Sequence, residues 1–345
     1  MASMPVAADK NYTASMTLVF CAYNEEASLP EKIENIANLK ARYPDLEVLA
    51  YDDKSSDATL AMLQKRPDLV RVIEGAGRTG KAHGMKIMAK EATGEIMIFT
   101  DANVLLDEQA IDNLMAYYAD PKVGGVCGSL HYLGEDVSST AAVGSAYWRL
   151  EERIKSEEAR TGSVMGGDGS IFSLRRTLYP TFPDSVLDDM TVSMAAVFAG
   201  KRLLKAGDVV AYERVVANRG DEISRKVRIA TRAFHTHLFL RPQLRQMTSK
   251  DKFKYMSHKF LRWFGGGFLL IGTLSFVLAM SLVSAWLALV LVLLGAVLIA
   301  IGLTSEMGKF ASITEIMIAL LATQWGTLRA MRGHTQTTWN PAASR

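Results

Sequence analysis

The residues best suited to chemistry stand directly after an apolar segment. Residues 95–100 are apolar enough to predict a buried strand, and Asp101, Ala102 and Asn103 follow it. This strand would carry a carboxylate and an amide oxygen, separated by one residue, at its C-terminal end. Such oxygen donors suit Mg²⁺ or Mn²⁺, usually together with phosphate oxygens. The tripeptide predicts a metal that holds a nucleotide diphosphate, and the competing interpretation is a plain strand-to-helix turn.

Polar clusters also follow two other strand-like segments, residues 17–21 and 46–51. These clusters are Ala22, Tyr23, Asn24 and Glu25 after the first segment and Asp52 and Asp53 after the second. Ligands of open α/β sheets bind in the crevice outside the carboxyl ends of the strands. Three polar strand ends therefore predict one shared binding crevice along one edge of a sheet.

Two basic groups can neutralise a diphosphate in that crevice. Arg78 and Lys81 lie in a glycine-rich loop that lacks the spacing of a P-loop. Arg225 and Arg228 share one face of a predicted helix with Arg232, a pattern that suits pyrophosphate or lipid headgroups. In each case the alternative is ordinary surface charge in contact with solvent.

Two further segments place carboxylates near predicted turns. Gly167 and Asp168 lie in a small-residue loop, where glycine permits close approach of a ligand and Asp168 can bind a sugar hydroxyl. Asp188 and Asp189 precede a predicted helix, residues 191–199, so one of them can cap the helix and the other can act as a general base. A tight turn and a helix cap are the alternatives.

Strand-like and helix-like segments alternate from residue 17 onward. Further strands are predicted at residues 69–73 and 125–130. Helices are predicted from about residue 33 to near residues 43–44, and at residues 58–65, 82–92 and 107–118. This alternation predicts an α/β fold with a mostly parallel sheet and helices on both faces. Cys21 and Cys127 both fall in strand-like segments and are expected to be buried thiols in a reducing compartment.

The C-terminal part of the chain predicts membrane helices. Residues 264–304 contain no charged side chain, and their length of about 41 residues is twice what one spanning helix needs. Two spans are predicted at about residues 264–284 and 286–304, with one very apolar core hairpin as the alternative. A third apolar helix at about residues 312–328 carries Glu315 and Gln324, so it crosses the membrane, lies at its surface or re-enters it. Basic flanks favour the cytoplasm at both ends, so we prefer a two-span hairpin and a third helix that does not cross.

The segment before the spans is basic. Residues 219–262 combine Lys and Arg with aromatic residues, which favours amphipathic helices on an anionic membrane surface over nucleic-acid binding. The formal net charge of the whole chain is only +3, so this basic character is local. The first residues lack the pattern of a secretory signal, so we expect the catalytic-looking part to stay in the cytosol.

The ordered set of these motifs resembles glycosyltransferase family 2, the inverting transferases with the GT-A fold, over residues 16–239. Lys81 lies in a loop similar to the family's Gly-Lys-Ala loop, and Asp53 matches the acidic residue that contacts the nucleotide base. Residues 101–103 are similar to the DXD metal motif, with Asn in place of the second Asp. Asp189 matches the last Asp of the segment that supplies the catalytic base.

The resemblance implies a site with separate donor, acceptor and metal residues. The donor nucleotide-sugar would contact Ala22, Tyr23, Asn24, Glu25, Asp53, Arg78, Lys81, Asp101, Ala102, Arg225 and Arg228; the acceptor would contact Gly167, Asp168 and Asp188; and Mg²⁺ or Mn²⁺ would bind Asp101 and Asn103. The implied organisation has four parts. They are a flexible tail (residues 1–14), a cytosolic GT-A domain (residues 15–235), basic interfacial helices (residues 236–262) and a membrane domain with a basic C-terminal tail (residues 263–345).

The resemblance also implies a reaction and a location. The chain would be a membrane-anchored bacterial enzyme of exopolysaccharide or lipid-linked oligosaccharide assembly. It would move one sugar, from a UDP-linked donor, to a hydroxyl of a polyprenyl-linked acceptor at the cytosolic face of the inner membrane. Residues 225–229 lack the Gln-x-x-Arg-Trp motif of processive members, which favours single addition. The alternatives are a polyprenyl-phosphate sugar synthase, a processive polysaccharide synthase and a catalytically silent scaffold or nucleotide sensor.

Overall fold

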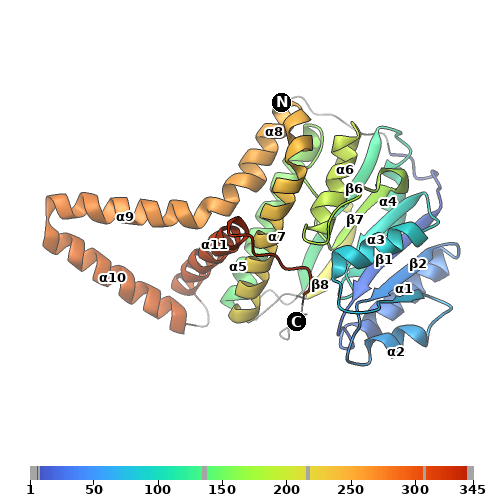
Figure 1. Cartoon of the computed structure of the whole chain (residues 1–345), viewed down its shortest axis with the longest axis horizontal. Helices are drawn as coiled ribbons and strands as arrows, with labels where there is room; N and C mark the ends of the chain where they lie inside the picture. The colour runs from blue at the N-terminus through green and yellow to red at the C-terminus, as the bar shows by residue number, and fades with distance from the viewer. Residues whose placement is uncertain (1–5, 7, 134–137, 215–217, 306–307, 340–345) are drawn as a thin grey trace.

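The structure is a computed structural model that describes residues 6, 8–133, 138–214, 218–305 and 308–339. A sheet with flanking helices forms one end of the molecule, and two apolar helices, α9 (Gly265–Val283) and α10 (Ala285–Thr304), project from the other (Figure 1). Three long helices lie between the two ends. They are α5 (Ser139–Arg160), α7 (Arg219–Gln246) and α11 (Lys309–Met331).

The sheet has eight strands in the order β3-β2-β1-β4-β7-β6-β8-β5. Their bounds are β1 (Met16–Ala22), β2 (Glu47–Asp52), β3 (Arg71–Glu74), β4 (Ile96–Thr100), β5 (Leu105–Leu106), β6 (Val123–Leu133), β7 (Ile171–Arg175) and β8 (Arg202–Arg214). The first four strands in that order are parallel to one another, as are β6 and β8. Strand β7 is antiparallel to both of its neighbours, and β5 is antiparallel to β8. The predicted α/β class is confirmed, with a mixed sheet that is parallel on the side of the N-terminal strands.

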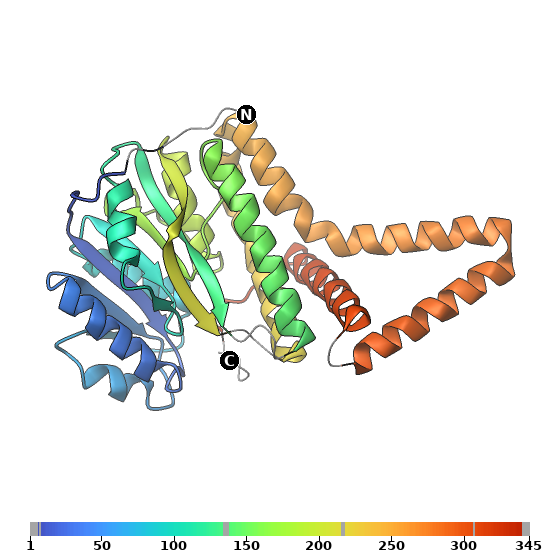
Figure 2. The same ribbon diagram turned by 180° about the vertical axis from the view of Figure 1, so that it is seen from behind.

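Helices cover both faces of the sheet, as Figure 2 shows from behind. The remaining helices are α1 (Leu29–Arg42), α2 (Thr59–Gln64), α3 (Lys81–Glu91), α4 (Ala110–Tyr117), α6 (Asp188–Phe198) and α8 (Ser249–Tyr255). A π-helical turn, Met256–Phe260, and a 3₁₀ turn, Leu261–Phe264, connect α8 to α9.

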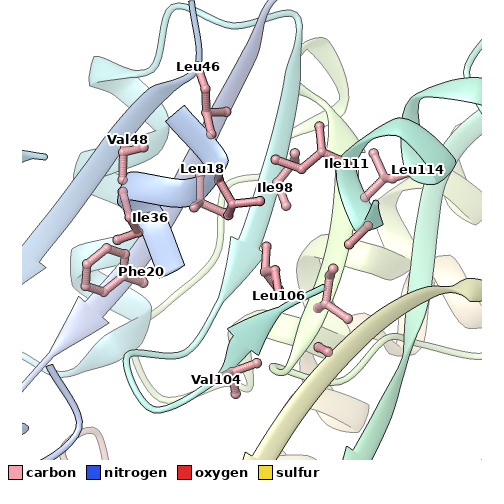
Figure 3. Packing of buried hydrophobic residues seen from close by; sticks show 14 of the residues in the cluster. Leu18, Phe20, Ile36, Leu46, Val48, Ile98, Val104, Leu106, Ile111 and Leu114 are labelled. Carbon is pink, nitrogen blue, oxygen red and sulfur yellow. The ribbon is translucent and has the colours of Figure 1, made fainter. Parts of the chain in front are cut away.

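The main core lies against one face of the parallel strands (Figure 3). Leu18 and Phe20 of β1 and Ile98 of β4 are fully buried there, and Ile36 of α1 packs against the same cluster. On the opposite face, Phe99 of β4 is also buried. Because these strands are buried on both faces, their sequences are continuously apolar, and polar residues begin where the strands end. This is why the strand ends could be predicted from the sequence.

Helix α7 joins the sheet domain to the apolar helices. It runs unbroken through the boundary expected between residues 235 and 236, so the basic segment continues a helix of the sheet domain. Gly326 of α11 allows close contact with α7, because a Cβ there would lie 2.4 Å from the carbonyl oxygen of Val227. Glu315 of α11 is only 5% exposed, and its carboxylate lies 2.5 Å from Arg219 of α7. The third apolar helix therefore packs against the sheet domain through polar as well as small residues.

Helices α9 and α10 expose most of their apolar surface. Two helical segments, Ser249–Val283 and Ala285–Thr304, are long and apolar enough to cross a membrane. Only 6% and 11% of their most apolar stretches are buried, whereas a core hairpin would be mostly buried. Their positions coincide with the two predicted spans, and their exposure argues against the core-hairpin alternative.

Candidate functional site

The polar ends of the parallel strands meet at one edge of the sheet. Strand β1 pairs in parallel with both β2 and β4, so the residues that follow these strands lie side by side. Lys81, the first residue of α3, donates from Nζ to Asp101 Oδ1 over 2.5 Å. The same Nζ lies 3.7 Å from Asp188 Oδ2 at the start of α6. Lys81 therefore links the predicted metal segment to the segment predicted to supply the base.

Lys81 is a fixed positive charge in this site. Burial would lower the pKa of its ammonium, but the carboxylates of Asp101, Asp188 and Asp189 outweigh burial and raise the pKa above its ordinary value. The Lys81 side chain is 18% exposed, so its charge is partly accessible to a ligand. It can stabilise negative charge that develops nearby.

The two carboxyl groups at the start of α6 have different surroundings. Asp188 lies within reach of two cations, since Arg232 Nη2 is 3.8 Å from its other oxygen, Oδ1. Burial, followed by the charge of Asp188, raises the pKa of Asp189 from 3.8 to about 6, against the opposing effect of Lys81. A pair of carboxyl groups whose environments differ in this way is typical of acid–base sites. Asp189 has the properties expected of a general base at neutral pH.

Asp101 and Asn103 have the chemistry to hold a divalent cation. Asp101 Oδ2 faces Gly169, where a Cβ would come within 3.1 Å, so glycine leaves room beside the carboxylate. Asn103 Nδ2 donates to Glu213 Oε1 over 2.9 Å, which leaves the amide oxygen of Asn103 as a metal acceptor. The described residues contain no group of three or more His, Cys, Asp or Glu side chains suited to a metal. Phosphate oxygens of a ligand would complete the coordination of Mg²⁺ or Mn²⁺, and the donor set fits that use.

Asp53, directly after β2, orders the loop between β3 and α3. Its carboxylate is fully buried and accepts hydrogen bonds from the backbone N–H groups of Thr79 (2.7 Å) and Gly80 (3.0 Å). In the same loop, the guanidinium carbon of Arg78 lies 3.0 Å from the centre of the Tyr23 ring. Asp53 thus fixes the loop that precedes Lys81, and its predicted contact with a nucleotide base stays a prediction.

The segment before the C-terminus reaches this loop. The carbonyl of Trp339 accepts from Arg78 Nη2 at 2.5 Å, and its ring meets the Tyr23 ring edge-on, with centroids 6.2 Å apart. Gly80 has a φ of 95°, and a Cβ there would lie 2.1 Å from the Thr337 carbonyl, so only glycine admits the tail. Trp339 was not among the residues predicted for the site, because a contact between distant segments leaves no local pattern.

A cavity of about 430 Å³ opens at this edge. The predicted site residues that line it are Glu25, Lys81, Asp101, Ala102, Asn103, Gly167, Asp168, Asp188, Asp189, Arg225 and Arg228. The other five, Ala22, Tyr23, Asn24, Asp53 and Arg78, are not among the described residues that line it. Trp339, which contacts Tyr23 and Arg78, lines the cavity on their side.

Asp168 is held as an anion on the cavity wall. Lys155 of α5 donates to its Oδ2 over 2.7 Å, and the backbone N–H of Ser170 donates to its Oδ1 over 3.2 Å. Burial alone would raise the pKa of Asp168, but Lys155 and the hydrogen bonds hold that pKa below its ordinary value. Gly167 lies beside it and donates its N–H to Ser193 Oγ of α6 over 2.7 Å. A fixed carboxylate in this position can accept a hydrogen bond from a sugar hydroxyl.

The predicted basic face of α7 serves two purposes. Arg225 faces the cavity and binds Glu222 through two contacts of 2.8 and 3.2 Å. Arg228 also lines the cavity, one turn further along. Arg232 is 2% exposed and donates to the carbonyl of Val186, so it supports the start of α6. The interpretation as plain surface charge is wrong for Arg232.

Comparisons with known proteins agree with this geometry. The mannosyltransferase PcManGT from Pyrobaculum calidifontis, solved with GDP-Man and Mn²⁺, superposes with a TM-score of 0.70 over 94% of this chain and 89% of its own, at 24% identity. Beta-monoglucosyldiacylglycerol synthase from Synechocystis is 26% identical over 47% of this chain and 35% of its own length. A Methanococcus voltae glucuronosyltransferase acting on a dolichyl N-acetylglucosaminyl phosphate is 24% identical over 40% of this chain and 48% of its own. The chain thus spans between about a third and a half of these two relatives.

The fold is the GT-A fold of nucleotide-sugar transferases. Residues 17–181 match the family model described as glycosyl transferase family 2. The chain therefore carries a glycosyl transferase family 2 domain, and the resemblance deduced from its motifs is confirmed.

Proposed function

We propose that this chain transfers one sugar, with inversion, from a UDP-linked donor to a hydroxyl of a polyprenyl-linked saccharide. One observation carries the proposal: the Lys81 ammonium lies 2.5 Å from Asp101 and 3.7 Å from Asp188, the neighbour of Asp189. The residues suited to a diphosphate and the residue suited to a base thus line one cavity.

Asp189 is the base in the proposed mechanism. Its carboxylate takes the proton of the acceptor hydroxyl while that oxygen attacks the anomeric carbon. The bond between the anomeric carbon and the diphosphate oxygen breaks at the same time, and the electron pair leaves with the diphosphate. A pKa of about 6 keeps the carboxylate mostly ionised at neutral pH and still basic enough to accept the proton. Attack on the face opposite the diphosphate inverts the anomeric configuration.

Positive charge stabilises the leaving diphosphate. A divalent cation held by Asp101 and Asn103 would supply Lewis-acid stabilisation there. Lys81 adds a charge that is already oriented before the reaction begins, so it needs no rearrangement. Asp168, which also lines the cavity, accepts a hydrogen bond from the acceptor sugar and orients it. PcManGT, which shares the fold, was solved with GDP-Man and Mn²⁺, which supports a metal-assisted reaction.

The acceptor is proposed to be a lipid because the cavity adjoins the apolar helices. Ile316 and Leu320 of α11 line it, and α11 packs against α9, where a Cβ on Gly266 would lie 2.7 Å from the Leu320 carbonyl. The names of both relatives compared above include a lipid, diacylglycerol in one and a dolichyl phosphate in the other. We place the catalytic domain at the cytosolic face of the bacterial inner membrane, anchored by α9 and α10, in surface or exopolysaccharide assembly.

Nucleotide release by the full chain in detergent tests the proposal. The assay presents UDP-, GDP- and dTDP-sugars with Mg²⁺ or Mn²⁺, with and without polyprenyl-linked lipid. Release from one donor that depends on lipid and stops with EDTA supports the transferase and identifies the sugar. Release from no donor, despite measurable nucleotide binding, contradicts it. Near-normal turnover by Asp189→Asn would instead indicate a polyprenyl-phosphate acceptor, because a phosphate is already anionic and needs no base.

A further inference from the structure

The cavity continues past the catalytic carboxylates toward the base of α9. At this end its wall includes Tyr147 and Glu151 of α5, Lys226 of α7, and Arg262, which follows the π-helical turn. The proposed chemistry uses none of these four residues. They come from three separate elements that meet where the sheet domain adjoins the apolar helices.

Two cations converge on the ring of Tyr147. Lys226 Nζ lies 5.2 Å from the ring centroid, and the guanidinium carbon of Arg262 lies 5.8 Å from it. Arg262 also donates to the Tyr147 hydroxyl. The side chain of Lys226 is 19% exposed and that of Arg262 is 33% exposed, so both charges are accessible from the cavity. The N–H donors of these two cations that are not used by Tyr147 or the carboxylates can make charge-assisted hydrogen bonds to an anion.

Carboxylates only partly compensate these cations. Glu222 binds both Arg225 (2.8 Å) and Lys226 (2.9 Å), so one acid serves two bases. Glu151 binds both Lys259 (2.7 Å) and Arg262 (2.8 Å), and it also lies 2.9 Å from His258 Nε2. The four Arg and Lys side chains therefore outnumber the two carboxylates that bind them. Glu213 and Glu158 make smaller electrostatic contributions at Arg225 and Arg262, and the side chains of Lys226 and Arg262 stay partly exposed.

The neighbouring positive charges affect the pKa of Lys226. Burial lowers the pKa of its ammonium, Glu222 opposes that effect, and the positive charges of Arg225 and Arg262 lower the pKa further. Like charges held close together in a partly buried site repel one another, and an anion placed between them relieves the repulsion.

Apolar side chains continue the wall beyond the charges. Those that line the cavity are Val143 of α5, Ile223 of α7, Trp263, and Ile316, Ala319 and Leu320 of α11. A ligand that fits both parts has an anionic group joined to an apolar chain.

We propose that Lys226 and Arg262 bind the phosphate of a lipid-linked acceptor beside Tyr147. This inference rests on the proposed function, since it takes the acceptor to be a lipid, and it adds where the lipid is held. With its phosphate held there, the apolar chain runs along α11 toward α9, and the sugar of the acceptor reaches Asp168 and Asp189. The donor diphosphate binds separately, at Lys81 and Asp101.

Binding of farnesyl phosphate to the full chain in detergent, without any donor, tests this site. Lys226→Met and Arg262→Gln should each weaken binding by about tenfold or more, because each removes a charge-assisted contact to phosphate. Lys226→Arg should retain most of the affinity. Lys252→Met is the matched control, since Lys252 is an exposed base on α8 outside this cavity, and it should bind farnesyl phosphate normally. Unchanged affinity in both cavity variants would overturn the proposal.

Three further probes identify the source of the anion. Farnesol should bind weakly and equally to all variants, because it lacks the phosphate. Inorganic phosphate that binds as tightly as farnesyl phosphate would overturn a lipid site. The third probe is binding to phosphatidylglycerol vesicles. If Lys252→Met loses this binding as much as Lys226→Met and Arg262→Gln do, the basic residues form a general membrane surface and the proposal is overturned.

Two controls separate this proposal from the transferase proposal. Nucleotide binding by each variant shows that the protein is folded, because the donor site lies at the other end of the cavity. A chain that binds farnesyl phosphate through Lys226 but releases no nucleotide keeps the phosphate site and contradicts the transferase. A chain that transfers sugar but binds farnesyl phosphate no better than farnesol supports the transferase and contradicts the phosphate site.

Discussion

The Lys81 ammonium lies 2.5 Å from one oxygen of Asp101, and the other oxygen of Asp101 faces Gly169, whose missing Cβ would come within 3.1 Å of it. One carboxylate thus serves a fixed cation on one side and leaves its second oxygen available on the other. This division allows Lys81 and a divalent cation to act on the same diphosphate from two directions. It also makes Lys81 a competitor for part of the negative charge of Asp101.

Replacing Lys81 with Met should separate these two effects. We expect kcat to fall by about 10²–10³-fold, because a preoriented charge beside the leaving group is removed. The concentration of Mn²⁺ needed for half-maximal activity should stay equal or decrease, since Asp101 loses its competing cation. Initial rates measured across a Mn²⁺ titration check both effects. A variant that needs far more Mn²⁺ would show instead that Lys81 supports the metal site.

Asp189 should determine the acidic side of the pH profile. Its raised pKa of about 6 means that kcat/KM increases as pH rises through that value and the base becomes ionised. The profile of the wild-type enzyme over acidic to neutral pH, with one saturating donor, tests this. An inflection close to the ordinary value of 3.8 would contradict the assignment of a buried base.

Asp189 should also lower the stability of the folded protein at neutral pH. A carboxyl group with a raised folded pKa favours the folded protein only while it is protonated, so stability is lost as pH rises from 3.8 through about 6. Asp189→Asn removes this loss and should melt at a higher temperature than wild type at neutral pH, while its activity falls. The difference in Tm should shrink as the pH approaches 3.8. A constant difference at every pH would mean that Asp189 is not buried as described.

The parts of the fold that the sequence predicted are those with one simple pattern. Strands β1, β2 and β4 are buried on both faces, so their ends and the polar residues after them could be located. Helix α5 escaped prediction because Glu151, Lys155 and Glu158 interrupt its apolar face. They are buried at 5%, 1% and 6% exposure in ion pairs with distant partners, which no local pattern reveals.

Site residues contributed by unpredicted elements were missed for the same reason. Lys155 reaches Asp168 from α5, and Glu213 reaches Asn103 from β8, which was also not predicted. Strand β8 alternates poorly, because polar residues such as Lys205 turn inward and bind Glu152 at 2.6 Å. Motif spacing therefore predicted residues that line one cavity, whereas the residues that position them depend on tertiary contacts.

Asn103→Asp tests the departure from the DXD metal motif. A second carboxylate would normally strengthen a metal site, but here the Asn103 amide donates to Glu213 over 2.9 Å. Asp in that position would face Glu213 as a like charge, so we expect lower activity at limiting Mn²⁺ and partial recovery at high Mn²⁺. Asn103→Asp combined with Glu213→Gln should restore the lost activity, because the new amide can donate to the new carboxylate. Initial rates of the wild type and these two variants decide the point, and a fully active single variant would contradict it.

Lys32 should make the stability of the protein depend on pH, because it is buried against the loop after Asp101. It is fully buried on α1, and its Nζ donates to the carbonyl of Val104 over 2.5 Å, in the loop after Asp101. Burial lowers its pKa to about 7, although Asp101 opposes the effect. A lowered pKa means that stability increases as pH rises from about 7 toward the ordinary value of 10.5. Thermal melts should show this rise for wild type and a flatter profile for Lys32→Met, and equal slopes would contradict the interpretation.

Trp339 should contribute to donor binding. Its ring meets Tyr23 edge-on, its carbonyl holds Arg78, and it lines the cavity beside the loop that Asp53 orders. Trp339→Ala removes an aromatic contact of about 0.5–1.5 kcal/mol, so KM for the donor should rise by about two- to tenfold with a smaller change in kcat. Trp325→Ala is the matched control, because Trp325 is 50% exposed on α11 and does not line the cavity. Equal effects of the two substitutions on donor KM would show that the tail acts through the stability of the protein and not at the donor site.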